Sequence, residues 1–410
     1  MQQHAILLFL IVASYTACGS SIADVDNALL AAAQTRQPSF VEDLRTLVNI
    51  DSGTGYETGL AQVEVFLAKR LKNLGAKVEI LAAPPAVGKI VVGTFQGNGT
   101  QNIMMMIHYD TVFEQGEAAK RPFKIEGNKA FGPGVADAKG GALIILHALD
   151  IAHKRGFKGY QMLTVLFNPD EEKSSLGSRE IIRGLASRQD VVLSYEPPEA
   201  DRVTVATNGI AWVHLDVKGL ASHAGSAPEK GRNAAVELSN QILQLKDLGN
   251  PVKGTTVNWT TVQAGNKAHV NIIPDQASAI ADMRMSDLTE LDRVQQDANR
   301  IVQNKLIPET EVSVAVENRR PPLSKNPASD NLASLANEIY RELGKTIESV
   351  AMRYGTDAGF AYNPNSNKPA ILDGMGIVGN RIHSSDEWAD LDSVPARLYL
   401  TVRMLETLAQ

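Results

Sequence analysis

The chain has 410 residues, of which 40 are Lys or Arg and 46 are Asp or Glu, so its formal net charge is -6 at pH 7. The hydrophobic fraction of 44% is that of a folded globular protein, and an acidic balance without a basic block argues against binding to nucleic acid or to anionic membranes. A single hydrophobic core rarely grows to this chain length, so we expect two domains.

The N-terminus carries a short apolar run over residues 5–13, which is typical of the core of an export signal. The run is too short to span a bilayer as a helix, and charged, amphipathic sequence begins at Asp24. We therefore predict a signal peptide over residues 1–23 and a periplasmic or secreted protein without a transmembrane segment. A tail or a hydrophobic N-terminal helix of the mature fold is the alternative.

Cys18 is the only cysteine, which excludes an intramolecular disulfide. Residues 16–20 resemble the junction at which bacterial lipoproteins are cleaved and lipidated, although Tyr15 departs from the Leu expected three residues before the cysteine. A lipid anchor at Cys18 is therefore one prediction, and loss of this cysteine with the signal peptide is the other.

The next part of the chain alternates between helical and strand-like patterns. Apolar residues recur at three and four residue steps between residues 25 and 76, which predicts two helices, the second ended by Gly75. Apolar runs then predict strands over residues 77–81, 89–95, 102–108 and 161–167, with a helix over 140–154. This alternation predicts an α/β fold with a mostly parallel sheet that is covered by helices on both faces.

The pattern changes between residues 202 and 317. Residues 211–217 and 277–283 alternate in the manner of strands, and amphipathic helices are predicted over 233–248 and 287–305. The resulting order of strand, helix, strand, strand, helix, strand is typical of a ferredoxin-like α+β unit. We predict that residues 208–319 form this unit as an insertion. Residues 24–207 and 320–410 then form the main domain, which resumes with segments 329–343, 347–353, 370–372 and 391–408.

Three adjacent acids, Asp170, Glu171 and Glu172, follow the apolar run of residues 163–167. Adjacent carboxylates repel one another, and a buried strand is expected to end in a neutral turn unless positive charge lies nearby. Metal ions would supply that charge. One Glu could then bind a metal ion while the other transfers protons. No role for Asp170 follows from the sequence.

Residues of metal-ligand type, including Glu172, lie at predicted strand ends and loops. They are His108, Asp137, Glu172, Glu196 and His383. In an open parallel sheet, ligands collect at the carboxyl ends of the strands. A mixture of imidazole and carboxylate suits zinc, with cobalt or manganese as alternatives.

Several short motifs resemble those of the co-catalytic zinc exopeptidases, the family that includes aminoacylases and carboxypeptidases. They are HYDTV at residues 108–112, GPGVAD at 132–137, NPDEEK at 168–173, EP at 196–197 and SHAG at 222–225. The resemblance runs in the same order from about Phe40 to the C-terminus. Within the family it is greatest to the bacterial glutamate carboxypeptidases, which remove C-terminal glutamate from folates.

The resemblance implies a ligand set for two zinc ions. Asp137 would bridge the two ions. His108 and Glu196 would complete the first site, and Glu172 and His383 would complete the second. Taken alone, each of these candidate ligands has an ordinary explanation. His108 could be a polar loop residue, for example, and Asp137 could cap the helix that follows it.

The resemblance also implies the residues that act beside the metal ions. Glu171 would be the general base on the attacking water, and Asp110 would orient the imidazole of His108. Glu171 could instead be an ordinary solvated acid. The residue matching His223 in the family reaches the active site of the partner subunit and stabilises the oxyanion. His223 would therefore require a homodimer that forms through the inserted domain.

Asn271, Arg284 and Arg320 resemble residues that bind the substrate carboxylate, a role that suits the planar guanidinium group. A salt-bridged surface Arg is the alternative for Arg284 and Arg320. Arg353 and Tyr354 depart from the family, because they replace small residues in a glycine-rich turn and could change the substrate pocket.

Together these features predict a dizinc exopeptidase that hydrolyses the amide bond to a C-terminal amino acid, with glutamate favoured, in N-acyl, folate-type or peptide substrates. An aminoacylase, dipeptidase or deacylase with the same zinc core is the nearest alternative. A peptide-binding protein without catalytic activity is the alternative from another class.

Overall fold

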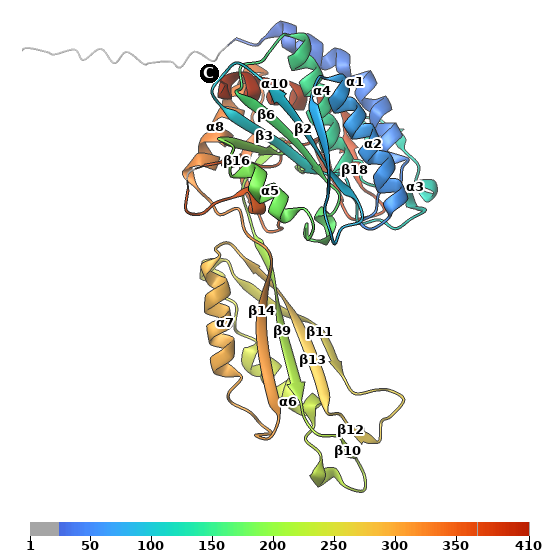
Figure 1. Cartoon of the computed structure of the whole chain (residues 1–410), viewed down its shortest axis with the longest axis vertical. Coiled ribbons are helices and arrows are strands. Elements are labelled where there is room, and N and C mark those ends of the chain that lie inside the picture. Colours follow the sequence, from blue (N-terminus) through green and yellow to red (C-terminus); the bar gives the residue numbers. More distant parts are fainter. Residues whose placement is uncertain (1–23, 367, 410) are drawn as a thin grey trace, which may run out of the picture.

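The computed structural model describes residues 24–366 and 368–409. The predicted export signal over residues 1–23, with Cys18, lies outside the described residues. Figure 1 shows a large domain that contains both ends of the described chain and a narrow small domain joined to it by two adjacent strands. Within the described ranges, no helix has both the length and the apolar character needed to cross a membrane.

The large domain is built on a six-stranded sheet of order β1-β2-β6-β3-β7-β16. Only β2 runs against the other strands, so the prediction of a mostly parallel sheet is confirmed. β3 and β6 are buried along almost their whole length because both faces are covered, which explains their continuous apolar sequences. The strands are β1 (Lys77–Ala82), β2 (Lys89–Gln96), β3 (Asn102–His108), β6 (Met162–Asn168), β7 (Val191–Ser194) and β16 (Ala370–Leu372).

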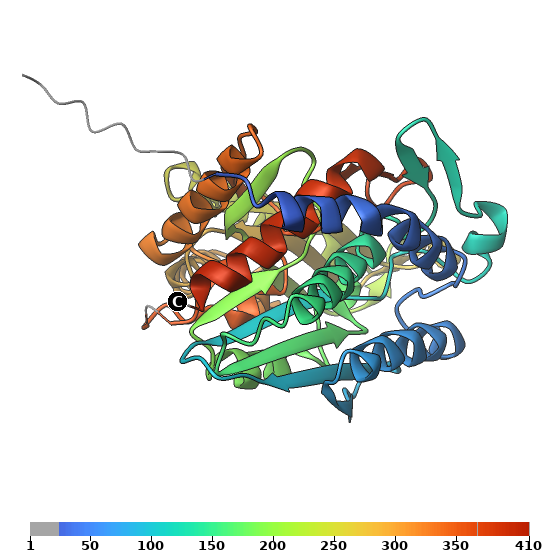
Figure 2. The same cartoon turned by 90° about the horizontal axis from the view of Figure 1, so that it is seen from above.

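Helices cover the two faces of this sheet unequally. Figure 2 shows α1, α4 and α10 side by side over one face, where they share a hydrophobic core with α2 and α8. The shorter helices α5 and α9 pack on the other face. The helices are α1 (Asn27–Val48), α2 (Glu57–Asn73), α4 (Lys139–Lys154), α5 (Arg179–Ala186), α8 (Pro327–Glu342), α9 (Ala358–Ala361) and α10 (Val394–Leu408).

A second, smaller sheet of order β17-β18-β5-β4 lies in the large domain. It pairs β5, which ends shortly before Asp137, with β18, which begins shortly after His383. The sheet therefore brings together two loops that are far apart in the sequence. Its strands are β4 (Lys124–Glu126), β5 (Lys129–Phe131), β17 (Gly379–Asn380) and β18 (Trp388–Asp390). The large domain also contains α3 (Glu117–Lys120) and the parallel pair β8 (Arg202–Thr207) and β15 (Glu348–Met352), which contacts α8.

The small domain has the element order that the sequence predicts for a ferredoxin-like unit. Its antiparallel sheet has the order β11-β13-β9-β14, and α6 and α7 pack on one face of it. A two-stranded ribbon of β10 (Ser222–His223) and β12 (Ile272–Ile273) lies at the end remote from the large domain (Figure 1). The main elements are β9 (Gly209–Lys218), α6 (Ala234–Leu245), β11 (Thr256–Ala264), β13 (Gln276–Met285), α7 (Thr289–Ile301) and β14 (Glu311–Arg320).

A buried carboxylate, Glu290 on α7, stabilises the small domain. It accepts hydrogen bonds from Thr255 Oγ1 at 2.7 Å and Arg293 Nε at 2.8 Å, and its carboxylate lies 3.2 Å from Lys253 Nζ. Burial alone would raise the pKa of Glu290, but the bonds from Arg293, Thr255 and Lys253 outweigh burial and hold the pKa at about 2. Because the folded pKa is below the ordinary value of 4.5, the stabilisation is present above pH 4.5 and is lost as the pH falls towards 2.

We therefore expect Glu290→Gln to lower the free energy of unfolding by about 1–3 kcal/mol at pH 7. The difference from wild type should shrink between pH 4.5 and pH 3, because the wild-type carboxylate loses its advantage as it protonates. Urea unfolding at pH 7, 5, 4 and 3 measures this, with Asp292→Asn, an exposed acid on the same helix, as the control. A cost that stays constant down to pH 3 would contradict the assignment.

Candidate metal centre

The five predicted ligands come from five separate segments of the large domain. His108 ends β3, Glu172 lies in the 3₁₀ turn Glu171–Lys173 after β6, and Glu196 lies two residues after β7. Since these strands are parallel neighbours, their carboxyl ends meet at one edge of the sheet. The loops that follow β5 and precede β18 add Asp137 and His383 at the same edge.

Asp137 lies between two pairs of residues. Its Oδ1 atom is 3.1 Å from Nε2 of His108, and its Oδ2 atom is 3.1 Å from Nε2 of His383. Glu196 Oε2 lies 3.7 Å from Nε2 of His108, and Glu172 Oε2 lies 3.3 Å from Nε2 of His383. Each oxygen of the Asp137 carboxylate therefore faces a different pair made of a histidine and a glutamate. Asp137 does not cap α4, whose N-cap is Ala138.

The cluster is rich in acidic groups, and its side chains are mostly buried except for that of His383, which is 51% exposed. His108 is 1% exposed, and the carboxylates of Asp137 and Glu196 are also buried. Burial, together with the charge of Asp137, raises the pKa of Glu172 to about 8, and burial also raises the pKa of Glu196 well above its ordinary value. Bonds to Asp137 and Glu172 raise the pKa of His383 to about 11. Such a cluster attracts additional positive charge.

These residues fit a pair of divalent metal ions. An ion that holds nitrogen and oxygen ligands at about 2.0–2.2 Å in tetrahedral geometry separates two of them by about 3.4 Å. The separations of 3.1–3.7 Å in the two pairs match this value. In addition, Glu172 Oε1 is buried and has no hydrogen-bond partner among the residues that the structure describes. The site could hold two ions that share Asp137.

Asp110 connects the ligand His108 with the acidic turn. Its Oδ1 atom lies 3.2 Å from Nδ1 of His108, as expected of a residue that orients the imidazole ring. Its carboxylate also accepts bonds from the backbone N–H groups of Glu171 at 3.1 Å and Glu172 at 3.2 Å, and from Thr54 Oγ1 at 2.6 Å. One carboxylate thus positions a ligand from β3 and the turn after β6.

Arg320, at the end of β14, extends from the small domain into this site. Its Nη1 atom donates to the carboxylate of Glu171 and to Gly355 O, and its Nη2 atom donates to Glu171 O at 2.7 Å. Its Nε atom is buried without a partner within the described ranges. The sequence predicted Arg320 near the substrate, and the structure places it directly against Glu171.

Asp170, for which the sequence offered no role, is a structural residue. It is 2% exposed and accepts bonds from Gly177 N at 2.7 Å, Ser178 N at 3.3 Å and Ser178 Oγ. Burial raises its pKa to about 6, even though these bonds favour the charged form. Asp170 therefore holds the segment that leads from the acidic turn into α5.

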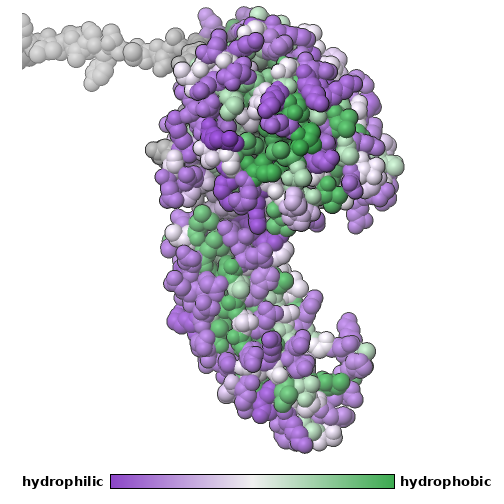
Figure 3. Space-filling model, in the orientation of Figure 1, coloured by the Kyte–Doolittle hydropathy of each residue, from purple (hydrophilic) through white to green (hydrophobic). Residues whose placement is uncertain are grey.

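His223 and Asn271 lie together but far from the cluster. His223 is in the ribbon at the tip of the small domain, and Asn271 O accepts a bond from the backbone N–H of Ala224 at 2.8 Å. Figure 3 shows a wide open space between this tip and the large domain of the same chain. Nδ1 of His223 accepts bonds from Gly225 N at 3.1 Å and Ser226 N at 3.0 Å, which places the ring proton on Nε2.

Arg284 is also outside the cluster. It lies on β13, and its Nε and Nη2 atoms donate to the two carboxylate oxygens of Asp282 at 2.8 Å and 3.0 Å. Arg284 and Arg320 both pair in register with Ile210, on opposite sides of β9. A substrate-binding role for Arg284 would need its guanidinium to exchange Asp282 for the ligand.

Asp357 and Asn168, which the sequence did not indicate as functional, also lie at the site. Asp357 accepts a bond from Asn168 Nδ2 at 2.6 Å and lies 3.9 Å from Arg320. Asn168 is the first residue of the NPDEEK motif, and Asp357 follows Tyr354 by three residues. These positions are the signal in the sequence that could have indicated them. Of the two departures from the family, Arg353 is exposed, and burial raises the pKa of Tyr354, with the charges of Asp373, Glu196 and Asp137 adding to the effect.

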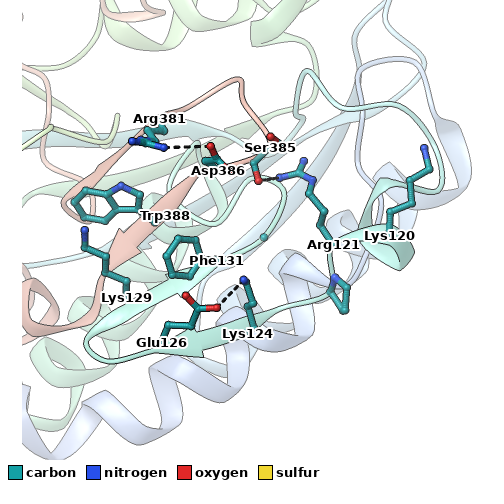
Figure 4. Close-up of a pocket in the computed structure, with 12 residues that line it drawn as sticks. Lys120, Arg121, Lys124, Glu126, Lys129, Phe131, Arg381, Ser385, Asp386 and Trp388 are labelled. Atoms are coloured by element: carbon teal, nitrogen blue, oxygen red, sulfur yellow. Dashed lines mark hydrogen bonds and ion pairs between the residues drawn. The ribbon is translucent and has the colours of Figure 1, made fainter.

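A cavity of about 660 Å³ adjoins the outer side of the loop that carries His383 (Figure 4). Its floor contains Phe131 and Trp388, which are paired in register across β5 and β18, and Lys129 Nζ lies 3.8 Å from the centre of the Trp388 ring. Lys124 and Arg381 in its wall are paired with Glu126 and Asp386. The cavity wall thus includes residues on both sides of His383 in the sequence.

Residues 104–407 match the model of peptidase family M20/M25/M40, and the chain belongs to this family. Carboxypeptidase G2 of Pseudomonas sp. is 39% identical to it over 98% of this chain and 97% of its own length. Acetylornithine deacetylase of Edwardsiella ictaluri is 27% identical over 90% of this chain and 97% of its own.

Solved structures show the same fold. The YxeP protein of Bacillus subtilis, described as a dinuclear metal-binding peptidase of the M20 family, has a TM-score of 0.67 at 16% identity, covering 92% of this chain and 99% of its own. The family match confirms the predicted family, and the likeness to solved structures confirms the predicted fold class. At 92% coverage of this chain, the structural match extends over parts of both the large and the small domain.

Proposed function

We propose that the protein is a dizinc metallo-exopeptidase of the carboxypeptidase type. It hydrolyses the amide bond to a C-terminal amino acid, with glutamate favoured, in N-acyl, folate-type or peptide substrates. The observation that carries the proposal is the position of Asp137, whose two oxygens face two separate pairs of histidine and glutamate beside Glu171. The 39% identity to a carboxypeptidase over nearly the whole chain supports the reaction type.

The proposed ligands form two sets that share Asp137. His108 and Glu196 complete one set, and Glu172 and His383 complete the other. Zinc suits this mixture of imidazole and carboxylate, and cobalt or manganese could substitute. When bound, two such ions polarise the substrate carbonyl and lower the pKa of the attacking water.

Glu171 takes the proton from the attacking water and returns it to the leaving amine nitrogen. Arg320 keeps the Glu171 carboxylate in place through Nη1, and its unpartnered Nε can donate to the carboxylate of the substrate. Asp110 holds the backbone of Glu171 and the ring of His108 in fixed positions. Asn271 and Arg284 are proposed as further groups that bind the substrate carboxylate.

His223 acts on the site of the partner subunit in a homodimer formed through the small domain. Two observations support this proposal: His223 is remote from the cluster of its own chain, and its Nδ1 accepts two backbone bonds, so that Nε2–H is available to an oxyanion. Asn271 lies beside His223 and would enter the same site with it.

Co-expression of two inactive variants tests this arrangement. In a heterodimer of His223→Ala and Glu171→Gln subunits, one of the two sites receives an intact Glu171 and an intact His223. Random pairing should therefore restore up to about one quarter of the wild-type activity, because half of the dimers are mixed and each has one complete site. Activity that stays at the level of the separate variants would contradict action across subunits.

The reaction is tested with a panel of substrates on the zinc-loaded protein. Chelator treatment should abolish hydrolysis of N-acyl-glutamates, and added zinc should restore it. Full activity in metal-free protein would exclude the proposal.

The second candidate, an aminoacylase, dipeptidase or deacylase, is favoured by the similarity to acetylornithine deacetylase. Values of kcat/KM for acyl-glutamate, acyl-leucine and dipeptides separate the two, and the presence of Glu171 argues against a protein that only binds peptides.

We further propose that the protein is exported to the periplasm or the medium. The apolar run at residues 5–13 supports an export signal, and the sequence around Cys18 supports a lipid anchor. Mass spectrometry of the mature N-terminus distinguishes cleavage before a lipidated Cys18 from cleavage after it.

A further inference from the structure

Glu387 is a buried carboxylate four residues after His383, and it binds the loop that carries Asp137. Its side chain is 0% exposed. Oε2 accepts a bond from the backbone N–H of Gly134 at 2.9 Å, and Oε1 accepts bonds from those of Ala136 at 2.9 Å and Asp137 at 3.0 Å. All three donors lie in the segment that ends at the shared carboxylate.

The loop between His383 and Glu387 is also fixed from its outer side. Arg121 Nη1 donates to Ser384 O at 3.3 Å. It also donates to Ser385 O at 2.9 Å (Figure 4). The backbone of His383 itself has a φ angle of 62°, in the left-handed region that side chains other than Gly rarely adopt. Such a conformation persists only where the surrounding contacts impose it. Contacts on both sides of the loop provide this constraint.

We infer that Glu387 is a positioning residue of the metal centre. It fixes the backbone of Asp137 and, through the short loop, places His383 opposite Asp137 Oδ2, where the two atoms are 3.1 Å apart. Glu387 is not a ligand in this assignment; it sets the distance between two ligands that come from loops about 250 residues apart. The inference rests on the proposed metal centre.

Glu387→Gln is the test variant because it keeps the volume of the side chain. The amide oxygen can still accept the bonds from Ala136 and Asp137, but the amide NH₂ group would face the N–H of Gly134, and two donors cannot bond. We expect the affinity for Zn²⁺, measured by titration of the metal-free protein, to fall about 10–100-fold, the effect usual for residues that orient metal ligands. The visible spectrum of the Co²⁺-loaded protein should change, and activity should return as zinc is added.

Asp51→Asn is the matched control. Asp51 accepts bonds from the backbone N–H groups of Gly116 and Ala118, both at 2.8 Å, at the N-terminus of α3, which carries no proposed ligand. A purely structural role for Glu387 predicts that both variants lose stability alike and keep the wild-type zinc affinity. The positioning role predicts that only Glu387→Gln loses zinc affinity and changes the Co²⁺ spectrum.

If Glu387→Gln does not accumulate as folded protein, Glu387→Asp serves in its place, because the shorter side chain cannot reach all three donors. Wild-type zinc affinity together with an unchanged Co²⁺ spectrum in either folded variant would overturn the inference. Absence of zinc binding by the wild-type protein would instead overturn the metal centre itself, so the two failures are distinguishable.

Discussion

Glu171→Gln is expected to lower kcat on an N-acyl-glutamate by about 10²–10⁴-fold, the range for loss of general acid–base catalysis. Gln has nearly the same shape as Glu and can still accept the bond from Arg320 Nη1, so the fold and the buried arginine should be preserved. It cannot take up a proton from water. Zinc content and KM should therefore stay close to wild type, and the loss should appear in kcat.

Steady-state kinetics together with the zinc content of the purified variant measure this prediction. Glu180→Gln is the matched control, because Glu180 is an exposed acid on α5 that pairs only with Arg183 in the described structure. It should leave kcat, KM and zinc content unchanged. Normal turnover by Glu171→Gln would show that another group moves the proton.

Asp137→Asn should have a still larger effect and should remove both metal ions. The two oxygens of Asp137 face different histidines, whereas Asn presents one oxygen and one NH₂ group and carries no charge. One side of the residue would then direct a donor at the imidazole, and neither site would retain the bridging carboxylate. We expect activity to fall by at least about 10⁴-fold, beyond the usual range for loss of proton transfer alone.

The zinc content after dialysis decides this prediction, and it should fall from two ions per subunit to less than one. Asp170→Asn is the control, since Asp170 is a buried acid of the same region whose carboxylate, among the described residues, accepts bonds only from Gly177 and Ser178. It should lower the free energy of unfolding by about 1–3 kcal/mol and keep both ions. Loss of a single ion in Asp137→Asn would show that the ions do not share this carboxylate.

Much of the fold could be predicted from the sequence because hydrophobic periodicity reflects burial. The continuous apolar run of β3 and the three and four residue spacing of α1 each indicate one type of element. The direction of β2 could not be predicted, since an apolar run looks the same in a parallel and an antiparallel strand. The sheet of β17, β18, β5 and β4 was missed because its strands have only two or three residues each.

Some features of the candidate site could likewise be predicted from the sequence, and others could not. The types and order of the proposed ligands were visible, because metal ligands and strand ends both leave signals in the sequence. The partners of Asp170 and Glu387 were not visible, because both carboxylates bind backbone N–H groups, which every residue type except proline can supply. The contact between Arg320 and Glu171 depends on how β14 enters the large domain, which no local pattern records.

From the sequence alone, the α/β class, the inserted unit, the acidic triplet and the set of candidate ligands followed, because each depends on the kind of residue and its spacing along the chain. Only the tertiary structure decided that Asp137 turns one oxygen to each histidine, that Asp170 is structural, and that Glu387 holds the loop of Asp137. The physical reason is that these properties are distances between atoms of distant segments. Such distances are set by packing and hydrogen bonding across the whole domain.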